Sequence, residues 1–222
     1  LIESFKNFPV FFKSCNLIIN EKSPLLKKIQ KKTLVKTKTI WISNICKTKN
    51  IPSIFIANEF FDALPIKQFF KKENQWFQKF VSINQQNKGA FINRKFNMNK
   101  LEKKLNFKIS KNQNFIEYSE LSFDYLKNIS KIIKKNDGGL LLIDYGYTQK
   151  RMKNTLQAIS KHKFVNILDN IGDVDITHNL SFELFKNFVK KIGGLTNDLT
   201  TQRKFLINMG IRKRAEMISK NK

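Results

Sequence analysis

The segment IPSIFIANEFFDALPIKQFF, residues 51–70, gives the clearest indication of the fold. Its apolar run Ile54–Ala57 is typical of a buried strand, and the run leads directly into Asn58 and Glu59. Two phenylalanines, a second acid at Asp62 and a proline follow. An amide and two carboxylates at the point where a buried strand reaches the surface predict a ligand site at the end of that strand.

The composition is that of a globular protein that can bury a core. The chain has 222 residues, 41% of them hydrophobic, and we expect one domain with an insertion. No apolar run reaches the ~18 residues that a membrane span requires, and the opening residues are too charged for a signal peptide. Cys15, Cys46 and His162 lack metal-ligand spacing, so no metal site is predicted, and two isolated cysteines are typical of a reducing compartment.

The formal net charge of +25 raises the question of a polyanionic partner. Of the 42 basic residues 37 are lysine, scattered along the chain, whereas base recognition led by arginine would favour a different mixture. We therefore interpret the charge as a solvated surface and expect no specific nucleic-acid partner. DNA binding should be weak, independent of DNA sequence and lost steeply with added salt.

Apolar periodicity predicts strands and helices in alternation. We expect strands over residues 16–20, 37–43, 53–58 and 138–143. We expect one helix to begin at Pro24 and four others to cover residues 98–105, 119–135, 182–192 and 203–209. Looser alternation over residues 67–96, with turns at KKENQW and NKG, predicts antiparallel hairpins inside a β-rich insertion at 67–115. In the helix 119–135 the predicted inner face holds Leu121, Tyr125, Ile129, and Ile132 or Ile133.

This alternation predicts an α/β sheet covered by helices on both faces. Three of its strands are followed by polar residues: Glu21, the pair Asn58-Glu59, and the pair Asp144-Tyr145. A single acid after a strand is usually a turn or a helix cap. Because ligands of such sheets bind at the carboxyl ends of the strands, three in succession favour a site there.

Six stretches together resemble one family. They are NEFFDALPIKQF (58–69), INEKSPLLKKIQ (19–30), GGLLLIDYGY (138–147), TLQAISKHKFVNIL (155–168), GDVDIT (172–177) and TQRKFLINMGI (201–211). In this order and content they are similar to the MidA-like methyltransferases, class I S-adenosyl-L-methionine enzymes that include a mitochondrial complex I assembly factor. The resemblance covers the chain from Leu1 to about Arg214.

The resemblance implies a Rossmann-like class I methyltransferase sheet, with S-adenosyl-L-methionine as the cofactor. It implies a protein arginine as the acceptor, on a respiratory complex I subunit or a similar protein. The compartment would be the cytoplasm in a bacterium or the mitochondrial matrix in a eukaryote. Two other hypotheses compete with this one: an assembly factor of the same fold without catalysis, and a basic nucleic-acid-binding module.

The resemblance also implies cofactor-binding and catalytic roles for the residues that match the family's motifs. Glu21 would accept hydrogen bonds from both ribose hydroxyls, beside Ser23 of the same motif. Asn58 would hold the cofactor or the acceptor, or would cap the following turn. Glu59 and Asp62, three apart on one turn, would either clamp the acceptor guanidinium or complement the dipole of that turn.

Residues on the acceptor side are less specific. Phe61 would form a pocket wall or belong to the core, and Asp144 with Tyr145 would contact the acceptor, although a turn with Gly146 is the simpler role for Asp144. Asp175 and Thr177 would line the acceptor side or form an Asx- or ST-type turn.

Two departures from the family pattern bear on the cofactor. The family carries a glycine-rich loop after its first strand, where the backbone approaches the cofactor closely, but this chain has no glycine before Gly89. We expect the first strand and its loop to precede Leu1 and the closing strand to follow Lys222, and this chain by itself to bind S-adenosyl-L-methionine poorly. Asn179 and Ser181 stand where family members often carry a histidine or acid and an aspartate.

Overall fold

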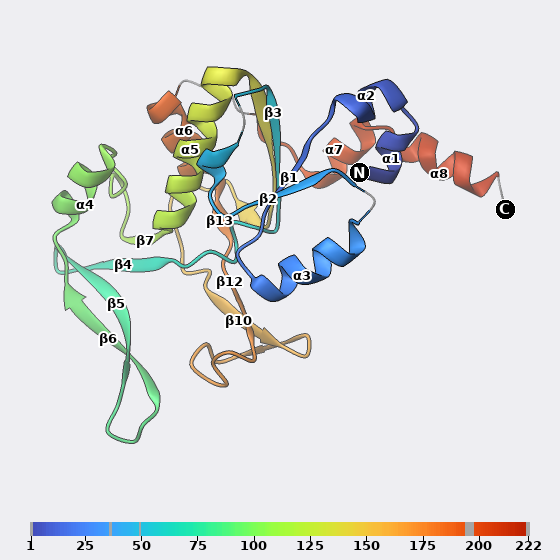
Figure 1. Ribbon diagram of the computed structural model, residues 1–222. Helices are drawn as coiled ribbons and strands as arrows, with labels where there is room; N and C mark the ends of the chain where they lie inside the picture. Colours follow the sequence, from blue (N-terminus) through green and yellow to red (C-terminus); the bar gives the residue numbers. More distant parts are fainter. Residues whose placement is uncertain (1, 36, 49, 194–197, 221–222) are drawn as a thin grey trace. The chain divides into compact units, whose positions relative to one another are not determined.

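The computed structural model describes residues 2–35, 37–48, 50–193 and 198–220 (Figure 1). The chain forms two compact units, Leu1–Pro52 and Ser53–Lys222. In the described part of the chain, no helix is both long and apolar enough to cross a membrane.

The first unit is built on two parallel strands. It contains α1 (Ile2–Lys6), α2 (Pro9–Ser14), β1 (Leu17–Asn20), α3 (Pro24–Thr33), β2 (Thr39–Ile42) and a 3-10 turn, η1 (Ile45–Lys47). The strands β1 and β2 pair in parallel with Leu17 opposite Thr39. The start of α3 is confirmed, because the Ser23 side chain accepts a hydrogen bond from the Leu26 N–H and a proline follows the cap.

The second unit holds a central parallel pair of strands. Here β3 (Ser53–Asn58) and β8 (Gly138–Ile143) align so that Asn58 lies opposite Ile143, and α5 (Glu120–Asn136) packs against both (Figure 1). Beside them lie α6 (Phe182–Gly193), which packs on α5, and a short parallel pair, β9 (Gly146–Tyr147) with β13 (Leu180–Ser181). The chain continues in α7 (Gln202–Asn208) and α8 (Ile211–Ser219).

The predicted hairpins are confirmed as one antiparallel sheet. Its order is β6 (Gly89–Lys95), β5 (Gln75–Ile83), β4 (Lys67–Lys72) and β7 (Phe115–Tyr118), and α4 (Met98–Leu105) joins β6 to β7. The first turn places Glu73 and Asn74 in the left-handed region, and Asn87 does so in the second. A second antiparallel sheet, which the sequence did not indicate, contains β11 (Lys163–Val165), β10 (Gln157–Ser160) and β12 (Asp175–Thr177).

The core of the second unit is aromatic, and it corrects the predicted face of α5. Leu121 is exposed, whereas Phe123, Leu126, Ile129 and Ile133 are buried. The rotation follows from Phe123, whose ring stacks on Phe188 of α6 at 3.9 Å and meets other rings edge-on. Ile129 and Ile133 therefore match the prediction, as does Tyr125, which is partly buried against Phe60, whereas Leu121 does not.

The strand β3 is not buried on both faces as its apolar run suggested. Ile54 and Ile56 are 77% and 49% exposed, while Ala57 packs against the core. Alternate side chains of a strand point to opposite faces, and α5 covers only the face to which Ala57 belongs. Asn58, in register with the two isoleucines, is accordingly exposed.

Candidate functional site

The carboxylate of Asp144 joins two of the sequence motifs. It follows β8, and its Oδ2 accepts hydrogen bonds from the backbone N–H groups of Phe61 (3.1 Å) and Asp62 (3.2 Å). Its Oδ1 accepts one from the neighbouring Tyr145 N–H (2.9 Å). Asp144 thus fixes a turn, but the turn is the one after β3 rather than one with Gly146.

The turn after β3 differs from the expected helical turn. Glu59 lies in the left-handed region with φ 45°, and its N–H donates to the carbonyl of Ile143 (2.9 Å), extending the β3–β8 pairing by one step. The turn itself runs from Phe61 to Leu64, closed by a 3.3 Å hydrogen bond between them. Glu59 therefore precedes the turn, so the helical spacing that placed Glu59 and Asp62 on one face does not apply here.

Exposure divides the candidate residues into two groups. Asn58, Glu59 and Tyr145 are exposed and available to a ligand. Phe61 is fully buried and meets Phe60 and Phe185 edge-on, so it belongs to the core, which was the alternative left open for it. Asp62 is buried too, with 7% of its surface exposed, and among the described residues its Oδ1 has no hydrogen-bond partner.

Burial and the nearby charge of Asp62 together raise the pKa of Asp144 to about 6, although three backbone hydrogen bonds act in the opposite direction. The ordinary pKa of an aspartate is 3.8, so the folded protein holds a proton here over a pH range in which the unfolded chain releases it. The stability that this proton confers is present below about pH 4 and is lost as the pH rises through about 6.

We predict that Asp144→Asn removes this pH-dependent component. The amide oxygen can still accept the Phe61 and Asp62 hydrogen bonds, but it carries no titrating proton. The melting temperature of the variant minus that of the wild type should therefore become more positive from about pH 4 to about pH 7. Thermal denaturation across this range measures it, with the exposed Asp175→Asn as a control for the loss of one carboxylate. A constant difference for Asp144→Asn would contradict the assignment.

His178 is the residue that sequence reasoning missed. Its backbone N–H donates to the carbonyl of Asp62 (3.1 Å), and its side chain is 6% exposed. Burial lowers its pKa, which keeps the imidazole neutral at pH 7. His178 directly follows the stretch GDVDIT, but the sequence assigned it no role, and its position against the turn depends on a contact with a residue more than 100 positions away.

A small cavity of about 20 Å³ lies beside His178. Among the described residues, His178 Nε2 and the Tyr147 hydroxyl have no hydrogen-bond partner, and both residues line this cavity with Glu117. The space suits one water molecule, which could satisfy both buried groups. The site thus has a polar interior behind the exposed residues at the end of β3.

Glu117 of β7 connects the antiparallel sheet to this interior. Its Oε1 accepts hydrogen bonds from the Gln68 side chain (2.8 Å) and from the backbone N–H groups of Thr155 (2.9 Å) and Leu156 (3.2 Å). The Thr155 hydroxyl donates to Oε2. The carboxylate is buried, so these donors are what stabilise its charge.

Asp175 and Thr177 lie in β12, so the turn alternative for them was wrong. Thr177 is opposite Gln157 of β10, whose side chain forms a 3.2 Å hydrogen bond with the Thr177 hydroxyl. Asp175 is exposed. The backbone joins this strand to the site, because His178 and the strand β13 follow it directly.

In the first unit, Glu21 is held in place at the end of β1. Its Oε1 accepts the Ser23 N–H and its Oε2 accepts the Gln30 side chain, both at 2.9 Å, while Gln30 accepts the Trp41 indole N–H at 3.0 Å. Each carboxylate oxygen keeps a further lone pair. A half-buried carboxylate oriented in this way fits a pair of ribose hydroxyls.

Comparison with known proteins identifies the class. Residues 1–200 match the family described as "Putative S-adenosyl-L-methionine-dependent methyltransferase", and the chain belongs to this family, in agreement with the resemblance to the MidA-like enzymes. Two crystal structures of COG1565 superfamily proteins from Burkholderia thailandensis share the fold. One is bound to S-adenosyl-homocysteine (TM-score 0.71, 19% identity, 96% of this chain and 57% of that chain). The other is a native structure (TM-score 0.73, 21% identity, 96% and 59%).

The curated relatives are named as protein arginine methyltransferases. The mitochondrial protein arginine methyltransferase NDUFAF7 of Danio rerio is 28% identical over 75% of this chain and 39% of its own length. The Caenorhabditis elegans homolog is 28% identical over 86% and 45%, and the Xenopus tropicalis protein is 25% identical over 95% and 54%. The chain spans about half the length of the curated relatives it matches.

Proposed function

We propose that the protein is an S-adenosyl-L-methionine-dependent methyltransferase that modifies an arginine side chain of another protein. The observation that carries the proposal is the turn held by Asp144, which leaves Asn58 and Glu59 exposed at the carboxyl end of the β3–β8 pair. In sheets of this kind, that edge is where ligands bind. Membership of the family and the names of the curated relatives support the choice of reaction.

The cofactor would be held in part by Glu21. Its carboxylate, oriented by the hydrogen bond from the Ser23 backbone N–H, would accept hydrogen bonds from the two ribose hydroxyls. When bound, S-adenosyl-L-methionine supplies a methyl group that is already activated for transfer. The protein therefore has mainly to orient the acceptor and exclude water.

The acceptor guanidinium would lie against Asn58, Glu59 and Asp62. Glu59 offers an exposed carboxylate, and Asp62 Oδ1 is a buried oxygen without a partner among the described residues. A buried acceptor of this kind costs free energy until a donor reaches it, and a planar guanidinium offers five donors. Asn58 would orient the nitrogen that receives the methyl group, and a carboxylate would take up the proton that this nitrogen loses.

The partner would be a protein, with a subunit of respiratory complex I as the first candidate from the MidA-like resemblance. Curated relatives carry mitochondrial names. These names support the mitochondrial matrix as the compartment if the source is a eukaryote, and we propose the cytoplasm if the source is a bacterium.

A transfer assay tests the proposal. The full gene product is incubated with tritium-labelled S-adenosyl-L-methionine and an extract that contains complex I subunits, and the labelled protein is digested and read by mass spectrometry. We expect methylated arginine in one or a few proteins. Binding of the cofactor without any transfer would favour an assembly factor that has lost catalysis, and label on other residues or on nucleic acid would refute the arginine assignment.

A further inference from the structure

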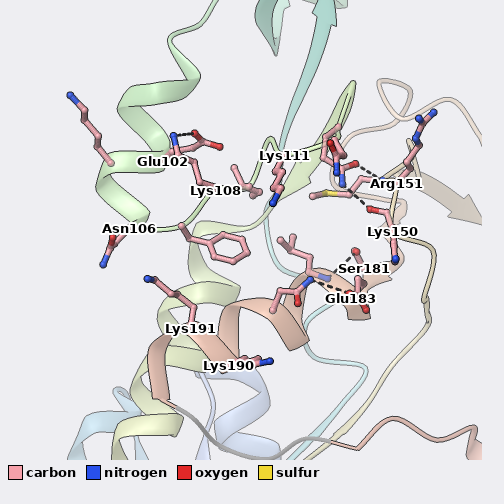
Figure 2. A pocket seen from close by; sticks show the side chains of 18 residues that line it. Glu102, Asn106, Lys108, Lys111, Lys150, Arg151, Ser181, Glu183, Lys190 and Lys191 are labelled. Atoms are coloured by element: carbon pink, nitrogen blue, oxygen red, sulfur yellow. Dashed lines mark hydrogen bonds and ion pairs between the residues drawn. The ribbon is translucent and has the colours of Figure 1, made fainter.

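A broad groove in the second unit is rich in basic residues (Figure 2). It has a volume of about 1140 Å³ and lies between α4, the segment 106–113, the segment 150–152 and α6. Seven cations line it: Lys103, Lys108, Lys111, Lys150, Arg151, Lys190 and Lys191. In Figure 2, Lys190 and Lys191 project from α6, and Lys150 and Arg151 stand on the opposite side of the hollow.

The cations are largely uncompensated. Among the described residues, two acids line the same groove, Glu102 and Glu183. Glu102 is buried and already accepts the Lys108 ammonium and the Ser110 backbone and hydroxyl groups. None of the other six cations forms an ion pair with a carboxylate in the described part of the chain.

The walls of the groove are tied together by hydrogen bonds within the chain. Gln113 links two of them, because its amide donates to the Lys150 carbonyl (2.7 Å) and accepts the Met152 N–H (2.8 Å). Glu102 ties the end of α4 to Ser110 in the same way. A preformed site loses less conformational entropy when a partner binds.

The described residues of the lining are partly apolar and include no aromatic ring that is free for stacking. Ile109, Met152 and Leu184 are buried side chains that contribute to it. Phe107 also lines the groove, but its ring packs edge-on against Phe123 and Phe188. Single-stranded nucleic acids are usually held by exposed aromatic faces and by arginine, and this groove has one arginine and a ring already engaged in the core.

The groove adjoins the candidate site. Ser181 and Leu184 line both the groove and the small cavity beside His178. His178 in turn contacts the turn of Asp62 through the backbone hydrogen bond described above. A chain that lies in the groove would therefore pass close to the residues assigned to the acceptor arginine.

We propose that this groove binds an acidic segment of the protein substrate, beside the arginine to be methylated. The inference rests on the proposed function for the identity of the partner, but not for the binding itself. Cations on four separate segments suit a partner with several carboxylates along an extended chain, and the apolar lining suits leucine-like side chains between them. The volume exceeds what a single small anion would need.

The test uses a fluorescein-labelled peptide rich in glutamate and aspartate with a few leucines, measured by anisotropy with the full gene product and without cofactor. A variant with Lys150, Arg151, Lys190 and Lys191 changed to glutamate should bind about tenfold more weakly or worse. The matched control reverses four exposed lysines of the antiparallel sheet and its turns, Lys71, Lys72, Lys88 and Lys95, and should lose less than about threefold.

Because glutamate near the end of α6 opposes the helix dipole, the loop pair Lys150→Glu and Arg151→Glu is tested separately, with circular dichroism as the check on folding. Equal loss in the groove and control variants would refute the proposal, as would equally tight binding of a lysine-rich peptide. Displacement of the peptide by a thymidine oligonucleotide of equal charge at a lower concentration would assign the groove to nucleic acid instead. Peptide binding that depends on the groove, together with no arginine methylation in the transfer assay described above, would leave the groove as a binding site for acidic segments and reject the enzymatic proposal.

Discussion

Glu59→Gln should lower methyl transfer by about 10²-fold or more, while the free energy of unfolding and the affinity for S-adenosyl-L-methionine change little. Glu59 is exposed, and its fixed contact is made by its backbone N–H, which the substitution leaves in place. Glutamine keeps the size of the side chain and removes the charge that would orient the guanidinium and receive a proton. The measurement is single-turnover transfer to an arginine-containing substrate, with urea denaturation of the same samples.

Glu73→Gln is the matched control for this experiment. Glu73 is also exposed and also left-handed, with φ 48° against 45° for Glu59, but it lies in the turn between β4 and β5. Its variant should transfer methyl groups normally. Asp62→Asn should lower methyl transfer as Glu59→Gln does. Because Asp62 is buried, the free energy of unfolding of the Asp62→Asn variant has to be measured together with its activity. If Glu59→Gln retains full activity, the acceptor role of this segment is wrong.

Gly138→Ala should destabilise the second unit by about 3 kcal/mol or more. Gly138 begins β8 with φ 129°, a conformation that side chains rarely adopt, and a Cβ built there would lie 1.9 Å from the backbone carbonyl oxygen of Ser53. Backbone atoms cannot yield as the end of a side chain can, so the first step of the β3–β8 pairing has to break. Urea denaturation followed by circular dichroism gives the change in free energy.

The neighbouring residue provides the comparison. A Cβ on Gly139 would meet nothing within 4 Å, so Gly139→Ala in the same strand should change stability by less than about 1 kcal/mol. Equal losses for the two alanine variants would mean that glycine is needed in this strand for reasons other than the approach to Ser53.

The sequence predicted the elements well because each carries its own local signal. The cap at Ser23, the helix at Met98–Leu105 and the two hairpin turns depend on a few adjacent residues, and the structure confirms all of them. The strand ends that present Asn58 and Glu59 were likewise readable from the change of apolar to polar residues.

What the sequence did not reveal depends on contacts between distant residues. Asp144 binds backbone groups 82 and 83 residues away, and no periodicity reports such a partner. The left-handed Glu59 is a backbone conformation that glutamate seldom adopts, so local propensity pointed to a helical turn instead. The rotation of α5 was set by aromatic packing between helices, and the apolar pattern of α5 by itself allowed either face.

The buried carboxylate of Glu117 has a consequence for how the second unit can be altered. It stands in the last strand of the antiparallel sheet but satisfies the amides of Thr155 and Leu156, which lie outside that sheet. An excision of the sheet would leave those amides without acceptors, and a transplanted sheet would keep only the Gln68 side chain as a donor to the carboxylate. The hairpins and the remainder of the unit should therefore unfold in one cooperative transition. In hydrogen exchange, the Thr155 amide should open together with the backbone amides of β4 and β7.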